Sequence, residues 1–140
     1  MIKIQLQKVD IPPGGVHLAL NVMLNEKQVR LVVDTGASRS VLDLHFFQEL
    51  FPDAVLKEEE SDSAGVGASG LSSFTSWVPS FFIESFEVKE YEIALMDLSH
   101  VKASYLHLGE EAIYGVLGGD ILERFEAMID YSDFSLTLLD

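Results

Sequence analysis

The sequence predicts an all-β domain with one or two short helices. Short runs of apolar and β-branched residues alternate with polar turns, which is typical of antiparallel strands. The 140 residues correspond to about one domain, and a hydrophobic content of 48% is enough for a core of this size. Because no linker, low-complexity tract or internal repeat divides the chain, residues 1–140 are expected to form a single domain.

The first half of the chain predicts a hairpin, a polar turn and a helix. Residues 17–24 and 28–33 are apolar runs on either side of a short polar turn, which predicts two paired strands. A polar turn at 34–38 precedes a further apolar segment at Val41 and Leu42. Residues 44–50 have helical spacing, and Pro52 disfavours continuation of the helix.

The second half predicts further strands and one short helix. Residues 57–63 are acidic and predict a solvated edge or loop, and a glycine-rich tip follows at 64–70. Aromatic and β-branched residues favour strands, whereas the amphipathic segment after Gly118-Gly119 favours a helix. The predicted strands are 71–83, 86–95, 127–131 and 134–139, and the segment 113–117 leads into the predicted helix at 120–125.

Composition excludes several classes of protein. The absence of cysteine excludes disulfide scaffolds, thiolate metal centres and thiol catalysis. A net charge of −14 repels phosphate backbones and anionic membranes, so we expect neither a nucleic-acid partner nor a membrane partner. The N-terminus lacks the apolar stretch of a signal peptide, and no apolar run reaches 18 residues. The predicted location is therefore cytoplasmic.

Three short motifs carry little information about chemistry. Residues 65–70 match the dinucleotide pattern G-x-G-x-x-G, but the buried strand before it and the helix after it are not predicted, so a flexible hairpin tip is the preferred interpretation. Residues 99–102 match S-x-x-K without the accompanying motifs of serine acyl-enzymes. The four histidines, His17, His45, His100 and His107, have no metal-ligand spacing.

A fourth motif places an ionisable group directly after an apolar strand. Asp34 follows Leu31-Val32-Val33 and begins the sequence Asp34-Thr35-Gly36-Ala37-Ser38. A carboxylate at the end of a buried strand is expected to be desolvated, which raises its pKa and requires hydrogen bonds that Thr35 and Gly36 can donate. The alternative is an ordinary turn in which Asp34 only caps the backbone.

The order of the motifs resembles the retroviral-type, retropepsin-like aspartic proteases. An apolar strand leads into D-T-G-A at residues 34–37, a glycine-rich hairpin surrounds Val66, and an apolar segment at 114–117 runs through Gly118-Gly119 into a short helix. The resemblance covers residues 15–139. It implies a closed, acid-protease-like β-barrel half.

The resemblance also implies an aspartic endopeptidase that works as a homodimer. Pepsin-like enzymes carry two D-T-G motifs in one chain, whereas this chain has Asp34 alone. Two copies would pair so that their Asp34 carboxylates share one proton and activate a water molecule. The implied substrate is an extended peptide or an unfolded protein, and no metal, cofactor or covalent intermediate is required.

Individual roles follow from the resemblance. Asp34 is the implied catalytic carboxylate, Thr35 would hydrogen bond across the dimer, and the Gly36 carbonyl would accept a hydrogen bond from substrate. Opening and closing of a glycine-containing flap would exclude water during the reaction. The residues implied to bind substrate are Ala37, Ser38, Val66 and Gly67.

The chain departs from viral relatives at two positions. Where those relatives pair an acidic residue after D-T-G-A with a late arginine, this chain has Ser38 and Gly119. Arg39 and Asp120 lie one position further along, and we expect them to form an exchanged ion pair or to be solvated. The terminal strand at 134–139 is expected either to interleave between subunits, as in viral relatives, or to be the last strand of its own sheet.

Two other functions remain open from sequence alone. The first is a non-catalytic peptide-binding or dimerisation module that retains the fold, although such a module has little need of a carboxylate at Asp34. The second is dinucleotide binding at residues 65–70, which a thermal-shift test with NAD would detect. Apolar residues that are candidates for substrate pockets are Val41, Val66 and Trp77.

Overall fold

The computed structural model describes residues 1–59 and 72–140, and it consists mainly of strands. The first six strands are β1 (Ile2–Gln5), β2 (Gln7–Ile11), β3 (Gly15–Leu24), β4 (Lys27–Val33), β5 (Val41–Asp43) and β6 (Lys57–Glu59). The remaining strands are β7 (Ser73–Ile83), β8 (Phe86–Met96), β9 (Gly115–Leu117), β10 (Met128–Asp130) and β11 (Ser135–Leu138). The helices are α1 (Leu44–Leu50), α2 (Ser99–His107) and α3 (Gly119–Arg124).

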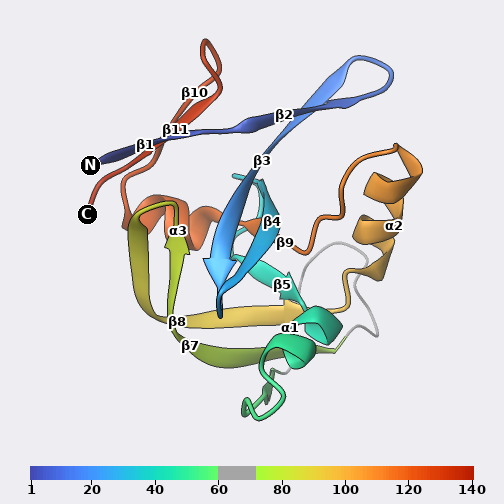
Figure 1. The fold of residues 1–140 in the computed structure, drawn as a ribbon, viewed down its shortest axis with the longest axis vertical. Helices are drawn as coiled ribbons and strands as arrows, with labels where there is room; N and C mark the ends of the chain where they lie inside the picture. The colour runs from blue at the N-terminus through green and yellow to red at the C-terminus, as the bar shows by residue number, and fades with distance from the viewer. Residues whose placement is uncertain (60–71) are drawn as a thin grey trace.

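Six strands close into a barrel. Their order is β3-β4-β9-β5-β8-β7, and β3 returns to β7 through the pairing of Met23 with Phe82 (Figure 1). Strands β2 and β6 extend the sheet beyond the barrel. Closure hydrogen bonds the strand edges to one another, which removes most free edges from a small β domain. The predicted closed β-barrel is confirmed.

A second sheet joins the two ends of the chain. Its order is β1-β11-β10, so β11 has a hydrogen-bonded neighbour on each side within its own chain. The expectation that residues 134–139 interleave with a second subunit is therefore wrong for this structure, because neither edge of β11 is free. The alternative, in which β11 belongs to its own subunit's sheet, is the observed arrangement.

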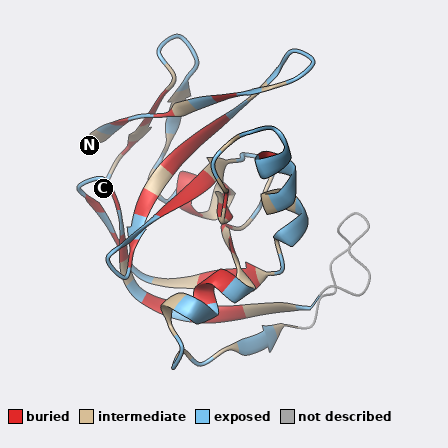
Figure 2. Ribbon diagram, turned by 45° about the vertical axis from the view of Figure 1, so that its right-hand side comes forward, coloured by how far each residue is buried: buried red, intermediate tan, exposed pale blue. Residues whose placement is uncertain are grey.

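The apolar residues form a main core inside the barrel and a smaller one beneath α2 (Figure 2). Fully buried side chains such as Phe47, Ile83 and Leu117 fill the main core. The smaller core consists of Val9, Ala19, Tyr105 and Ile113. It attaches α2 to the outer side of the β2–β4 strands, close to the end of β4.

Most predicted elements are present, whereas the strands β1 and β2 and the helix α2 form in segments for which no element was predicted. The hairpin of β3 and β4 and the helix α1 match the predicted positions, and the Asp43 side chain caps α1 by accepting a hydrogen bond from the Phe46 amide. The structure has three helices in its described part, against one or two predicted. Helix α2 was missed for two reasons. It buries only Tyr105, so its sequence lacks an amphipathic pattern, and no side-chain cap marks its first turn.

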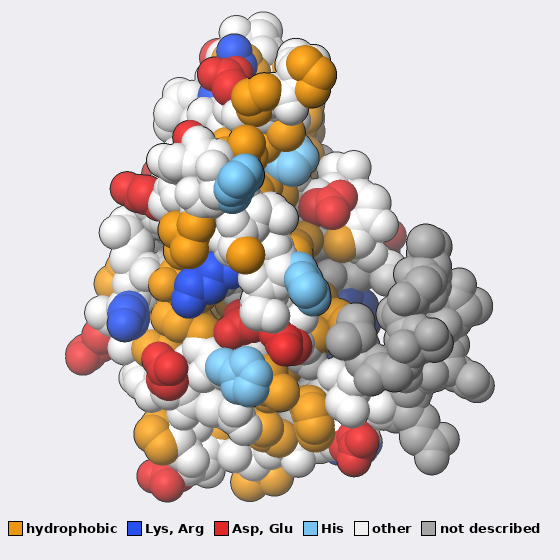
Figure 3. All heavy atoms as spheres, turned by 90° about the vertical axis from the view of Figure 1, so that its right-hand side faces the viewer, with side chains coloured by type: hydrophobic (Ala, Val, Ile, Leu, Met, Phe, Trp, Pro, Cys, Tyr) orange, Lys and Arg blue, Asp and Glu red, His pale blue; other side chains and the backbone are white. Residues whose placement is uncertain are grey.

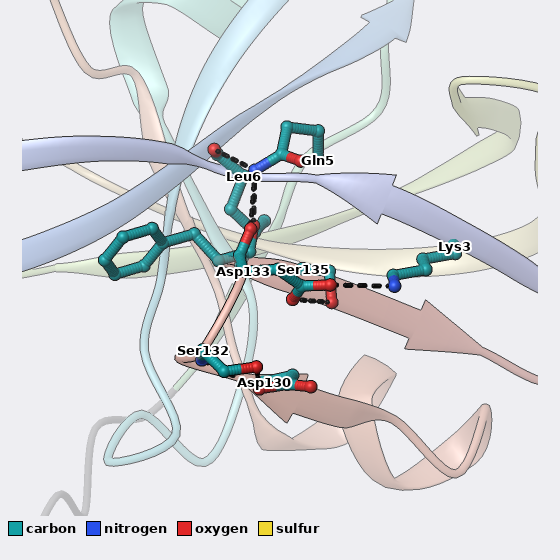
Figure 4. Close-up of polar contacts among 8 residues, drawn as sticks. Lys3, Gln5, Leu6, Asp130, Ser132, Asp133 and Ser135 are labelled. Carbon is teal, nitrogen blue, oxygen red and sulfur yellow. Dashed lines mark hydrogen bonds and ion pairs between the residues drawn. The ribbon is translucent and has the colours of Figure 1, made fainter.

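Polar contacts join the N-terminal strand to the turn before β11 (Figure 4). The Lys3 ammonium lies 2.8 Å from the Asp133 carboxylate. The Gln5 amide donates to the carbonyl oxygens of Asp133 and Phe134 at 2.9 and 3.0 Å, and the backbone N–H of Leu6 donates to Phe134 O at 2.8 Å. These bonds fix the register of β1 against β11 within one chain.

The Lys3 ammonium also sets the titration of Asp133. Its hydrogen bond, together with one from the Ser135 hydroxyl, lowers the pKa of the Asp133 carboxyl below its ordinary value of 3.8. A carboxyl with a lowered pKa in the folded state stabilises the fold above its unfolded-state pKa, and this contribution disappears as the pH falls through the folded-state pKa. Because the pair is exposed, its effect on stability is small.

Substitution of Lys3 tests the pairing of β1 with β11. In Lys3→Gln, the pKa of Asp133 is expected to rise towards its ordinary value, because the donor charge is gone. Carboxyl-carbon NMR titration measures this pKa directly. Lys8→Gln, which removes the partner of Asp10, is the matched control and should leave Asp133 unchanged. An unchanged Asp133 pKa in Lys3→Gln would contradict the observed register.

Candidate active site

Strand β4 delivers Asp34 to a tight loop at the end of the barrel. Parallel pairing of Val33 with Leu117 ends the strand, and the Asp34 backbone N–H then donates to Leu117 O at 3.0 Å. The Gly36 N–H donates to Asp34 Oδ1 at 2.8 Å, and the Ala37 N–H donates to the Asp34 carbonyl oxygen at 3.2 Å. The loop therefore fixes both the backbone and the side chain of Asp34.

Asp34 is exposed in the single subunit, as are Thr35 and Gly36. The prediction that the apolar strand desolvates this carboxylate is wrong for one subunit, because β4 ends at the rim of the barrel and the loop turns outward. Of the two expected donors, Gly36 supplies its N–H. Asp34, Thr35 and Val33 line a hollow of about 280 Å³.

A buried hydrogen-bond network supports the loop from below. Ser40 is 1% exposed, and its backbone N–H and hydroxyl both donate to Asp120 Oδ1, at 2.9 and 2.8 Å. The hydroxyl of Ser40 in turn accepts the N–H of Gly118 at 2.8 Å. The second carboxylate oxygen of Asp120 accepts a hydrogen bond from the Tyr91 hydroxyl. One carboxylate thus connects the loop to α3 and to β8.

The two late glycines contact the loop directly. The Gly119 N–H donates to the Ala37 carbonyl oxygen at 2.7 Å. A Cβ atom at Gly118 would lie 2.7 Å from the carbonyl oxygens of both Ala37 and Arg39, whereas one at Gly119 would be 3.4 Å from the nearest. Gly118 is therefore required for close packing of β9 and α3 against the loop.

Arg39 and Asp120 do not form the expected ion pair. Arg39 instead lies 2.9 Å from Glu59 and 3.9 Å from Glu92. The Asp120 oxygens already accept hydrogen bonds from Ser40, from Tyr91 and from the backbone N–H of Ile121. The exchanged-pair hypothesis is wrong because Arg39 pairs with Glu59, while the next residue, Ser40, is the one that donates to Asp120.

The structure does not bring the other residues predicted to bind substrate together in one pocket within its described part. Ala37 and Ser38 belong to the loop itself, while Val66, Gly67 and the G-x-G-x-x-G match at 65–70 lie outside the described residues. Trp77 is 64% exposed and lies opposite Glu92 on the neighbouring strand, and Val41 is half-buried in β5. These two residues are therefore not brought into one pocket with Asp34.

Sequence reasoning missed Ser40, Tyr91 and the pair formed by His17 and Tyr105. The His17 Nδ1 atom lies 2.5 Å from the Tyr105 hydroxyl, and His17 lines the same hollow as Asp34. No local pattern identifies these residues, because their partners are 29 to 88 positions away along the chain. In residues 1–59 and 72–140, no group of three or more acidic or histidine side chains is arranged to hold a metal ion.

The closed barrel and its D-T-G loop define the fold as that of the retropepsin-like aspartic proteases. A family model described as aspartyl protease matches residues 20–121. The chain therefore belongs to the aspartyl protease family. A comparison with curated proteins finds no match. None of the described helices has both the length and the apolar character needed to cross a membrane.

Solved structures with the same fold align with most of this chain. The retroviral protease-like domain of Ddi1 from Leishmania major aligns with a TM-score of 0.59, 15% identity and 87% of each chain covered. A retropepsin-like aspartic protease from Rickettsia conorii aligns with a TM-score of 0.57 and 21% identity, covering 98% of this chain and 91% of that one. The EIAV protease in complex with an inhibitor aligns with a TM-score of 0.55 and 19% identity, covering 83% and 93%.

Alanine substitution of the two glycines tests the close packing. Gly118→Ala is expected to lower the free energy of unfolding by about 1–3 kcal/mol, because its methyl group meets backbone oxygens that cannot move without displacing the loop. Gly119→Ala has room for a methyl group and keeps the N–H, so it serves as the matched control. Urea unfolding measures both. Equal effects in the two variants would contradict the described packing.

A double-mutant cycle tests the bond between Tyr91 and Asp120. Tyr91→Phe and Asp120→Asn should each destabilise the fold by about 1.5–3 kcal/mol, since each removes a hydrogen bond to a charged group. The double variant should lose clearly less than the sum, because both changes delete the same bond. Glu123→Gln, an exposed change on the same helix, is the control. Strict additivity would show that the two side chains do not interact.

Proposed function

We propose that this chain is an aspartic endopeptidase that acts as a homodimer, with one Asp34 from each subunit in a shared site. The main support is the exposed Asp34-Thr35-Gly36 loop, which is held rigidly from below yet leaves its carboxylate open to the outside. Each chain contributes one such carboxylate. A second subunit placed over the loop would supply both the second carboxylate and the desolvation that one subunit lacks.

The proposed chemistry needs only the two carboxyl groups. Two carboxylates in close contact cannot both ionise, so they hold one proton between them. The ionised Asp34 accepts a proton from a water molecule, whose oxygen attacks the peptide carbonyl carbon. The protonated Asp34 donates to the carbonyl oxygen. When the C–N bond breaks, one carboxyl gives its proton to the leaving amine, and a hydroxyl of the tetrahedral intermediate returns a proton to the pair as it becomes the product carboxyl. The pair therefore again holds one proton.

The proposed substrate is an extended peptide or unfolded protein. A peptide that adds as a strand obtains affinity from main-chain hydrogen bonds and selectivity from side-chain pockets. Gly36 would accept a hydrogen bond from the peptide backbone, and Thr35 would bond to the other subunit. Ala37, Ser38, Val66 and Gly67 are the proposed substrate-binding residues. The ion pair of Arg39 with Glu59 would link the loop to the chain segment that precedes Val66 and Gly67.

Asparagine at position 34 tests the chemistry. Purified protein and its Asp34→Asn variant are incubated with a diverse peptide library between about pH 3 and pH 7, and the products are identified by mass spectrometry. Cleavage is expected to fall by about 10²- to 10⁴-fold in the variant, because the general acid and base are both removed. Asp53→Asn, an exposed acid-to-amide change elsewhere, should cleave like the parent.

Subunit mixing tests whether the site is shared. With a ninefold excess of Asp34→Asn subunits, only about a tenth of parent subunits pair with each other, so the activity per parent subunit should fall about tenfold at equilibrium. If the parent retained full activity under these conditions, a complete site would reside in one chain. A protein shown to be dimeric that binds peptides but cuts none would favour the alternative of a non-catalytic peptide-binding module.

A further inference from the structure

His17 and Asp34 lie next to the last paired residues at the open end of the β3–β4 hairpin. The ladder pairs Leu18 with Val33, so the next positions outward are His17 and Asp34. Both residues are exposed, and both line the hollow of about 280 Å³ at this end of the barrel. The imidazole therefore borders the same space as the candidate catalytic carboxylate.

Tyr105 holds this imidazole in place from α2. The tyrosine is only 6% exposed and packs against Val9, Ala19 and Ile113 in the smaller core. Its hydroxyl lies 2.5 Å from His17 Nδ1. An exposed histidine whose ring is fixed by a buried hydroxyl is pre-organised, because the entropy of ordering the ring has already been lost on folding.

The hydrogen bond leaves Nε2 as the free donor. Burial, together with the negative charges of Asp34 and Glu110, raises the pKa of Tyr105 against the opposing effect of Arg30, so the tyrosine keeps its proton. His17 is the only acceptor of this buried O–H among the described residues. In the neutral ring Nδ1 accepts from the tyrosine and Nε2 carries the proton. In the imidazolium Nδ1–H donates to the Tyr105 oxygen instead, so Nε2–H is free in both forms.

The surroundings of His17 mix both signs of charge. Asp34 lies across the hairpin, Arg30 and Glu110 lie around Tyr105, and Lys8 and Asp10 form an ion pair on the neighbouring strand β2. Figure 3 shows the α2 side of the molecule, where histidine, acidic and apolar side chains are interspersed. The walls of the hollow include Val16, Leu18 and Ile129.

We propose that His17, positioned by Tyr105, is a specificity-determining residue that binds a carboxylate side chain of the peptide beside the cleaved bond. The inference rests on the proposed function, which it extends by a substrate class. An imidazolium N–H and a carboxylate form a charge-assisted hydrogen bond, and His17 is the cationic candidate among the residues that line this hollow. Once the imidazole is neutral, the negative charge at Asp34 in the same hollow disfavours a second carboxylate.

Matched peptide pairs test the proposal. The members of each pair differ only by Glu or Gln at one position beside the cleaved bond, so their kcat/KM ratio isolates the carboxylate. At about pH 5 the parent should prefer Glu at one position by about tenfold. Raising the pH to about 7.5 should weaken or invert that preference, because a neutral imidazole forms no charge-assisted hydrogen bond with a carboxylate.

Three variants test whether the Glu preference depends on His17 and Tyr105. His17→Gln should abolish the Glu preference at about pH 5, and Tyr105→Phe should reduce it while keeping the packing of the ring. His45→Gln, an exposed histidine on α1, is the matched control and should retain the preference. Binding of the same peptides to Asp34→Asn, followed by fluorescence anisotropy, provides a readout that does not need catalysis.

The outcomes separate this inference from the proposed function. Suppose that the parent cleaves peptides. If it shows no Glu preference at any position, or one that His17→Gln leaves intact, the role of His17 is overturned while the proposed protease activity is supported. No cleavage, combined with a Glu preference in binding that His17→Gln removes, would support the site and overturn the protease. The absence of both cleavage and binding would overturn both.

Discussion

The carboxylate of Asp120 is the contact on which the candidate active site depends. It accepts hydrogen bonds from the backbone and hydroxyl of Ser40, from the Tyr91 hydroxyl and from the first turn of α3. A partly buried carboxylate is costly unless such donors surround it, so its position is strongly determined. Through Ser40 and Gly118 it holds the D-T-G loop against β9. The loop is thus rigid although its outer side is open.

This rigidity explains how an exposed carboxylate fits a proposed catalytic role. Asp34 is fixed by the Gly36 amide and by a backbone bond to β9, yet within residues 1–59 and 72–140 it is exposed. Placing a second such loop against the first would then require little rearrangement of either subunit. With a net charge of −14, each subunit repels its copy, so we expect dimerisation to strengthen as salt is added.

The terminal strands and α2 lie outside the closed barrel and add to the surroundings of the candidate site. Strand β11 is enclosed by β1 and β10, so any dimer must use surfaces other than the edges of that strand. Helix α2 adds a second small core beside the hairpin that ends in Asp34. Its one buried side chain, Tyr105, reaches the ring of His17. Helix α2 therefore contributes a polar side-chain contact at the rim of the candidate site.

The sequence by itself determined the barrel strands β3, β4, β7 and β8, the helices α1 and α3, and the catalytic candidate at Asp34. These features depend on local patterns: apolar runs, turn residues and a motif confined to residues 34–37. Helix α2 escaped detection because it buries a single side chain. Only the tertiary structure decided which partners meet, including Ser40 with Asp120, His17 with Tyr105, and Arg39 with Glu59 rather than Asp120. It also decided that Asp34 is exposed. The physical reason is that a side chain's partners and solvent contact depend on barrel closure and strand register, which join residues far apart in the chain.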